Sequence, residues 1–324
     1  MSIVPALSVV VPLYNEEACL PEFYRRMTAA CQASKVGSYE LIFVNDGSSD
    51  GSLDILLRLQ KADSTVRIVD MARNHGHQLA LSAGLAHARG DRVLAIDADL
   101  QDPPELLSAM MTQMDAGADV VYAQRNRRAG EPRFKLATAA LFYRLLAQIS
   151  DTHIPVDTGD FRLMSRRVVD VIVSMPEGHR FIRGLVAWIG LKQVPLRYDR
   201  AERFAGKTKY PFFKMLAFSL DAITAFAAAP LRIVFLASIV AMGLAMVAMI
   251  WTFYSFFFLD AVAGWSSLMV VFLFFTSIQL FSLAFIGEYV GRTFMESKRR
   301  PLYLVKATYP SGAATPNSEA GEQA

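Results

Sequence analysis

The first two hundred residues alternate short apolar runs with segments whose apolar residues recur at helical intervals. The apolar runs are typical of buried strands and lie at residues 7–11, 41–44, 66–69, 93–96 and 120–122. The helical segments lie between them, at residues 19–32, 53–60, 78–88 and 105–114. Because strands alternating with helices usually join a mostly parallel sheet covered on both faces, we expect an α/β domain over residues 1–200.

Two long apolar runs near the C-terminus have a different pattern. Residues 233–259 and 261–287 contain no charged residue, and only Asp260 separates the two runs. As helices they would each be about 40 Å long at ~1.5 Å per residue, which exceeds the ~30 Å hydrocarbon core of a bilayer. This predicts a hairpin of two transmembrane helices over residues 231–291, whereas two buried core helices would rarely lack charge for so long.

The flanking charges predict how the hairpin is oriented. Basic residues precede the first run and follow the second, and the connection carries only Asp260. The positive-inside rule therefore places the α/β domain and both termini in the cytoplasm of a multi-pass protein of the bacterial inner membrane. Residues 1–12 have no signal-peptide pattern. We expect residues 201–230 to form a basic juxtamembrane loop and an interfacial amphipathic helix, or a helix packed on the soluble domain, and residues 292–324 a largely disordered cytoplasmic tail.

Composition excludes several classes of protein. Hydrophobic residues make up 53% of the chain and charged residues 19%, and a formal net charge of +3 is too balanced for a protein that binds nucleic acid. Two cysteines exclude a disulfide framework and a four-cysteine metal site. No G-x-G-x-x-G or P-loop pattern is present, which disfavours a dinucleotide-binding enzyme and a P-loop NTPase.

Carboxylates follow the fourth predicted strand. Asp97 and Asp99 are one residue apart, and like charges at the end of a buried strand repel each other. A divalent cation beside them would offset this repulsion, and Mg²⁺ typically takes one or two carboxylates together with water and phosphate oxygens. The pair therefore predicts a metal site, with a solvated turn as the alternative.

Two other strand ends are less specific. Residues 45–52 are dense in Asp, Gly and Ser, which is typical of a tight turn, although Asp46 could also accept hydrogen bonds from a base or a ribose. His75 and His77 flank Gly76 without carboxylates nearby in the sequence, and we interpret them as loop residues rather than zinc ligands.

Together these segments resemble a known family. The chain reads VVVPLYNEE at 9–17, VNDGS at 44–48 and DADLQDP at 97–103, and it resembles family 2 glycosyltransferases with the GT-A fold. The segments TGDFRL at 158–163 and RFAGKTKY at 203–210, followed by two apolar runs, narrow the resemblance to polyprenyl-phosphate glycosyltransferases such as the bactoprenol glucosyltransferases and the dolichol-phosphate mannosyltransferases. The Q-x-x-R-W signature of processive synthases is absent from the sequence. At position 75 the family more often has an aromatic residue.

The resemblance implies a role for each site residue. The nucleotide-sugar would be bound by Pro12, Tyr14, Glu16, Asp46 and Asp97, and Mg²⁺ or Mn²⁺ by Asp99 and Gln101. Asp160 and Arg162 would act with Asp99 in catalysis, Asp160 by orienting acceptor and sugar, because a phosphate with a second pKa of ~6 needs no strong base. The acceptor phosphate would be bound by a set of cations: Arg125, Arg128, Arg203, Lys207 and Lys209.

The resemblance therefore implies an enzyme that transfers one sugar with inversion, most simply from UDP-glucose, to undecaprenyl phosphate at the cytoplasmic face of the membrane. Mannose, an N-acetylhexosamine or an aminoarabinose derivative are alternatives for the sugar, since no motif reports the few hydrogen bonds that select a hexose. A non-catalytic membrane scaffold is an alternative of a different class. The resemblance is also compatible with a homo-oligomer.

Overall fold

The computed structural model describes residues 4–125, 158–178, 180–199 and 264–310, together with scattered positions between 240 and 258. The chain forms two compact units. One combines Met1–Tyr143, Thr152–Pro211 and Pro301–Ala324, and the other combines Arg144–Asp151 and Phe212–Arg300.

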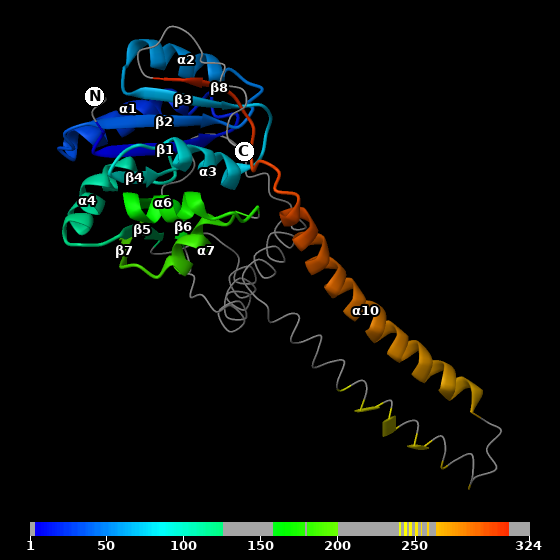
Figure 1. The fold of residues 1–324 in the computed structure, drawn as a ribbon. Helices are drawn as coiled ribbons and strands as arrows, with labels where there is room; N and C mark the ends of the chain where they lie inside the picture. Colours follow the sequence, from blue (N-terminus) through cyan, green and yellow to red (C-terminus); the bar gives the residue numbers. More distant parts are fainter. Residues whose placement is uncertain are drawn as a thin grey trace. The chain divides into compact units, whose positions relative to one another are not determined.

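The first unit is built on one eight-stranded sheet (Figure 1). Its strands stand in the order β7-β5-β6-β4-β1-β2-β3-β8. Their bounds are β1 Leu7–Leu13, β2 Tyr39–Asn45, β3 Val66–Met71, β4 Arg92–Ala95, β5 Val120–Arg125, β6 Thr158–Ser165, β7 Gln193–Tyr198 and β8 Val305–Tyr309. The five strands expected from the apolar runs are all present, and the prediction of a mostly parallel α/β sheet is confirmed.

Helices connect the strands and cover the sheet. They are α1 Leu20–Ala33, α2 Ser52–Ala62, α3 His77–His87, the short 3₁₀ helix η1 Pro104–Leu106, α4 Leu107–Asp115, α6 Arg166–Ser174 and α7 Ile182–Ile189. Helix α1 packs with α2, η1 and α4, and α3 packs with α6, which in turn contacts α7. Apolar side chains of β1 and β2, such as Val9, Val11 and Phe43, meet Phe23 and Met27 of α1 in the core.

Parallel pairing brings four strand ends to one edge. β1 pairs in parallel with β2 and with β4, and β2 pairs in parallel with β3. The loops that follow these strands therefore lie along the same edge, where ligands of open α/β sheets bind. This edge carries Asp46 and Asp97, which are the polar residues singled out in the sequence.

Strand β6 adds a further carboxylate to this edge because it runs antiparallel to β4. Ala95, the last residue of β4, pairs with Arg162. Continuing the antiparallel register by two residues places Asp97 opposite Asp160. Two segments that are about sixty residues apart in the chain thus meet at the carboxyl end of β4.

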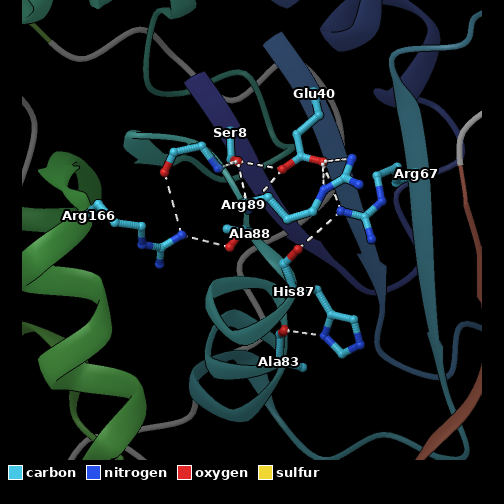
Figure 2. A network of polar contacts seen from close by, with 9 residues as sticks. Ser8, Glu40, Arg67, Ala83, His87, Ala88, Arg89 and Arg166 are labelled. Carbon is cyan, nitrogen blue, oxygen red and sulfur yellow. Dashed lines mark hydrogen bonds and ion pairs between the residues drawn. The ribbon is translucent and has the colours of Figure 1, made fainter. Parts of the chain in front are cut away.

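A buried polar network holds the opposite ends of the strands together (Figure 2). Glu40 of β2, 3% exposed, accepts hydrogen bonds from Ser8 Oγ of β1 at 2.6 Å and from Arg67 Nη1 of β3 at 2.8 Å. It also accepts from the backbone N–H and the guanidinium of Arg89, which lies between α3 and β4. The network fixes three strands and a connection away from the candidate site.

The segment after the predicted hairpin differs from expectation. Residues 305–309 form β8, an antiparallel edge strand on β3, with Ile68 paired to Tyr309 and Val69 to Thr308. Gln60 Nε2 donates to the carbonyl of Pro310 at 2.7 Å, and Ala72 N donates to that of Leu304 at 2.9 Å. The prediction of a largely disordered tail is therefore wrong for residues 292–310, because polar composition did not reveal a strand that finds its partner more than 230 residues earlier in the chain.

The second unit contains the long helix α10, Trp265–Ser297. Within the described part of the chain, α10 is the one helix that is long and apolar enough to cross a membrane, over Phe274–Ser297. Its apolar side chains are exposed to a degree that a soluble helix rarely shows, including Phe272, Leu280, Phe281, Leu283 and Val290. The first predicted span lies mostly outside the described residues.

Candidate active site

The loop after β2 presents Asp46, which is 3% exposed. Its carboxylate accepts backbone hydrogen bonds from His75 N at 2.7 Å and Gly76 N at 2.9 Å. Burial raises the pKa of Asp46 above its ordinary value, although these two donors oppose the shift. Gly47 (φ +66°) allows the loops after β2 and β3 to approach each other, because a Cβ at this position would lie 2.7 Å from the backbone of Arg73. The loops after β2 and β3 are thereby joined at the edge of the sheet.

The loop after β1 is joined to the same region. Asn15, with a left-handed φ of 57°, receives a hydrogen bond from Ser49 N at 2.8 Å and donates its backbone N–H to Ser48 Oγ at 3.0 Å. Glu16 N donates to Ser52 Oγ at 3.0 Å. Tyr14 is 47% exposed at this edge and is available to stack on a planar ligand, whereas Pro12 is buried within β1.

The loop after β4 presents Asp97 and Asp99. Asp99 is 8% exposed and accepts the backbone N–H of Gln101 at 3.1 Å, while Leu100 between them has a left-handed φ of 60° and a buried side chain. Left-handed backbone at a leucine costs about 1–2 kcal/mol, and such strain is often found in functional loops. The loop is therefore held in a conformation that the leucine alone does not favour.

The residues of this loop fit a divalent cation. Asp97 Oδ1 is buried and accepts no hydrogen bond from any residue that the structure describes. Burial raises the pKa of Asp97 to about 6, and the charges of Asp160, Asp102 and Asp99 add to this shift while His77 opposes it. A cation near these oxygens would relieve that excess of negative charge, and oxygen donors are the ligands Mg²⁺ and Mn²⁺ prefer. Within the described residues no group of three or more His, Cys, Asp or Glu side chains is arranged as a metal cluster, which is compatible with an ion that also takes donor phosphate and water.

Asp160 is the most constrained carboxylate of the site. Its side chain is 6% exposed and has partners on two helices: His77 Nε2 lies 3.0 Å and Gln78 Nε2 2.9 Å from Oδ2, and Arg183 Nε donates to Oδ1 at 3.1 Å. Burial alone would raise the pKa of Asp160, but Arg183 and His77 hold it well below its usual range. Asp160 is therefore a fixed anion at neutral pH and a poor proton acceptor.

His77, Gln78 and Arg183 are site residues that the sequence did not reveal. His77 is the first residue of α3 rather than a loop residue, and its interpretation as such is wrong. Its carboxylate partner lies 83 residues away, and Arg183 lies 23 residues beyond that. Gln78 also accepts Ile182 N at 2.9 Å and so ties the start of α3 to the start of α7.

Arg162, which the resemblance places in catalysis with Asp160 and Asp99, is buried on β6. It is 3% exposed and donates through Nη2 to the carbonyl of Gly159 at 2.9 Å, and burial lowers the pKa of its guanidinium to about 10. Its positive charge also lowers the pKa of Asp160, so within the described residues Arg162 is a buried counter-charge of this carboxylate. The phosphate-binding cations predicted from the sequence are not placed by the structure: the side chain of Arg125 and the residues Arg128, Arg203, Lys207 and Lys209 lie outside its described part.

The carboxyl edge of this mostly parallel sheet gathers four carboxylates, those of Asp46, Asp97, Asp99 and Asp160, and such an edge is where open α/β sheets bind their ligands. Residues 8–173 match the glycosyl transferase family 2 model, and the chain belongs to this family. A second family model, described as GtrB C-terminal hairpin, matches residues 229–293.

Relatives of the whole chain agree with this assignment. The glycosyltransferase YkcC of Bacillus subtilis is 48% identical over 93% of this chain and 94% of the relative. A prophage bactoprenol glucosyl transferase homolog of Escherichia coli is 41% identical over 93% of this chain and 98% of the relative. The bactoprenol glucosyl transferase of Shigella phage SfV is 39% identical over the same shares, 93% and 98%. Among solved structures, glucosyl-3-phosphoglycerate synthase from Mycobacterium tuberculosis with Mn²⁺, UDP and phosphoglyceric acid covers 68% of this chain and 76% of that chain at 22% identity and a TM-score of 0.48, a likeness too distant to assign a ligand.

Proposed function

We propose that this glycosyltransferase transfers a single sugar from a nucleotide-sugar, UDP-glucose by preference, to undecaprenyl phosphate at the cytoplasmic face of the membrane. The observation that carries the proposal is the meeting of Asp46, the Asp97–Asp99 loop and Asp160 at one sheet edge, in a chain that also matches the GtrB C-terminal hairpin model. The names of the relatives as bactoprenol glucosyl transferases support a polyprenyl phosphate acceptor and a glucosyl donor.

The donor would lie across the loops that follow β1, β2 and β4. Asp46 is held by two backbone donors and offers its remaining lone pairs to a base or ribose, and the exposed ring of Tyr14 offers a stacking face. Asp97 would lie at the ribose side, next to Asp99 and Gln101, which would hold Mg²⁺ or Mn²⁺ at the diphosphate. When bound, this ion supplies a Lewis acid that stabilises charge on the departing nucleoside diphosphate.

Asp160 would orient the reacting groups rather than remove a proton. Its pKa is held low by Arg183 and His77, and most of its hydrogen-bonding capacity is occupied by three side chains. A phosphate monoester is largely ionised at neutral pH, with a second pKa of ~6, so its oxygen can attack the anomeric carbon without a base. The sugar transfers with inversion when attack comes from the face opposite the nucleotide, and Asp160 contributes by position and charge.

The acceptor would arrive from the membrane side. A hairpin over residues 231–291, with the α/β domain and both termini in the cytoplasm, would keep the catalytic domain at the leaflet where polyprenyl phosphate is exposed. Lys207 and Lys209 precede the hairpin and are the first choice for the acceptor phosphate. Lys209→Ala should raise KM for the lipid phosphate much more than KM for the donor, and equal effects on both would remove the assignment.

The test is direct transfer by the purified full chain. Wild-type protein is mixed with radiolabelled UDP-glucose, Mg²⁺ and undecaprenyl phosphate, and label is counted in the organic phase. Parallel reactions use UDP-N-acetylglucosamine, GDP-mannose and a UDP-aminoarabinose derivative, and Asp99→Asn serves as the inactive control. We expect UDP-glucose to give the lipid-soluble product. If only another donor gives product, the transferred sugar is the sugar of that donor and not glucose. If no donor gives product, the result supports a non-catalytic scaffold.

A further inference from the structure

Gln78, the second residue of α3, connects two elements that are distant in the sequence. Its side-chain amide donates through Nε2 to Asp160 Oδ2 on β6 at 2.9 Å. The oxygen of the same amide, Oε1, accepts the backbone N–H of Ile182, the first residue of α7, at 2.9 Å. Because one planar amide supplies both the donor and the acceptor, the two hydrogen bonds fix Asp160 and the start of α7 relative to each other.

Arg183 closes this connection into a ring of hydrogen bonds. It is the second residue of α7, and it donates through Nε to Asp160 Oδ1 and through Nη1 to the carbonyl of Thr158, each at 3.1 Å. The two oxygens of Asp160 are therefore held from two sides. Gln78 donates to Oδ2, which also lies 3.0 Å from His77 Nε2, while Oδ1 accepts from the guanidinium. Gln78 thus acts on the carboxylate twice, directly and through the backbone position from which Arg183 extends.

The acceptor at the start of α7 comes from a distant part of the chain. The residue before a helix often satisfies one of the first N–H groups with its own side chain, but α7 is preceded by Phe181, which has no acceptor. The N–H of Ile182 bonds instead to a side chain 104 residues earlier, whose other group faces Asp160. Capping α7 needs an acceptor alone, whereas this amide also holds a carboxylate of the candidate site. The two-sided contact therefore indicates a role in placing Asp160 as well as in capping α7.

We propose that Gln78 is a positioning residue for glycosyl transfer. It sets the direction of the Asp160 carboxylate by its own hydrogen bond and by fixing the start of α7, from which Arg183 reaches the other oxygen. The inference rests on the proposed function, in which Asp160 orients the acceptor and the sugar. In this role Gln78 contacts neither substrate, and its effect on the reaction passes through Asp160.

The first test is Gln78→Met, which keeps the length of the side chain and removes both hydrogen bonds. We expect kcat of the purified full chain to fall about 10- to 100-fold with donor KM within about twofold of wild type, because misplacing reacting groups by about 1 Å costs on the order of 100-fold. Gln78→Asn is a second variant, which keeps an amide but is too short to reach both partners. It should lower kcat in the same way.

Gln60→Met is the matched control, because it removes a long-range hydrogen bond of another glutamine. Gln60 is 4% exposed, and its Nε2 donates to the carbonyl of Pro310 at 2.7 Å. This contact lies near the amino end of β3, where Tyr309 pairs with Ile68, and so away from the carboxyl edge. The control should lower the midpoint of thermal unfolding about as much as Gln78→Met does, but it should keep the kcat of wild type.

A double-mutant cycle separates an effect through Asp160 from a general structural effect. Asp160→Asn keeps the shape of this side chain and replaces the carboxylate that Gln78 places. Single-turnover reactions with excess enzyme measure the slow rates of these variants. We expect Gln78→Met to lower the rate by less than about threefold in the Asp160→Asn background, because residues that act through one another are not additive. A structural role would give the same factor in both backgrounds.

Four results would overturn the proposal. They are a Gln78→Met kcat within about threefold of wild type, an equal loss of kcat in Gln60→Met, the same factor in both backgrounds of the cycle, or a failure of both Gln78 variants to fold, which would assign the residue to stability alone. If Asp160→Asn has no measurable rate, the comparison with Gln60→Met decides. If the wild-type chain transfers no sugar, the proposed function fails first, whereas an active wild type with an indifferent Gln78 rejects this inference alone.

Discussion

Replacing Glu40 by glutamine should destabilise the sheet because it turns one acceptor of a buried network into a donor. One carboxylate oxygen accepts Ser8 Oγ at 2.6 Å and Arg89 N at 2.9 Å, and the other accepts Arg67 Nη1 at 2.8 Å and Arg89 Nη2 at 2.9 Å. A glutamine satisfies one of these pairs only, and its amide NH₂ then faces the donors of the other pair.

The expected loss in the free energy of unfolding depends on how exposed Glu40 and its arginine partners are. Removing one partner of a buried ion pair costs about 3–5 kcal/mol. Glu40 and Arg67 are 4% and 18% exposed, but Arg89 is 49% exposed and its share is screened by solvent, so we expect about 2–4 kcal/mol. At roughly 2–4 °C per kcal/mol for a domain of this size, the midpoint of thermal unfolding should fall by about 10 °C.

The assay is circular dichroism of the detergent-solubilised full chain during heating, with Glu22→Gln as the control. Glu22 also pairs with an arginine, Arg25 at 2.7 Å, but the two side chains are 33% and 68% exposed, so water screens the pair and we expect no measurable shift. Equal midpoints for the two variants would refute the reasoning.

The pH dependence of the same variant gives an independent check. Burial alone would raise the pKa of Glu40, but hydrogen bonds from Ser8, Arg89 and Arg67 outweigh it and leave the pKa below its ordinary 4.5. A lowered native pKa means stability that is present above 4.5 and is lost as pH falls through the native value. The difference between wild type and Glu40→Gln should therefore shrink in acid.

Three further outcomes are expected. Gly90→Ala should lower stability by about 2 kcal/mol in the same melts, because its Cβ would lie 2.6 Å from the backbone nitrogen of Ser8, and an unchanged midpoint would contradict the close approach. Tyr198→Phe removes a hydrogen bond to Asp102 beneath the β4 loop and should cost about 1.5–3 kcal/mol, measured by urea denaturation of the solubilised chain. Chelation with EDTA or Asp99→Asn should each reduce transfer at least about 100-fold in the labelled-product assay, and full activity without a divalent ion would reject the metal role.

Local sequence patterns were sufficient to predict the first five strands of the sheet, β1 to β5. The runs that predicted β1 to β5 are apolar because those strands are buried on both faces, so composition alone marks them. Strand β7 has a mixed pattern, with Gln193 and Val194 half-buried and Pro195 exposed, and no periodicity distinguishes it from a loop. Strand β8 is similar, since Lys306 is exposed and the strand is ordered by its pairing with β3.

Site residues that directly follow predicted strands could be found from the sequence. Site residues that meet only because of the order and direction of the strands in the sheet could not. Asp46, Asp97 and Asp99 end parallel strands and could be placed from the sequence. His77 and Arg183 could not, because their common partner Asp160 reaches the edge only through the antiparallel insertion of β6 beside β4. Arg162, two residues after Asp160 on the same strand, is buried as Asp160 is, and its role in catalysis stays a prediction.

The strand β8 imposes an order on biosynthesis. It is made after α10, so the ribosome has completed the apolar helix before the outer edge of β3 can be covered. Until then the backbone N–H and C=O groups along the outer edge of β3 are not paired with β8. Such an unpaired edge can form hydrogen bonds with a strand of another chain. A fragment stopped before the hairpin, prepared to obtain a water-soluble catalytic domain, would keep that bare edge permanently and is expected to self-associate.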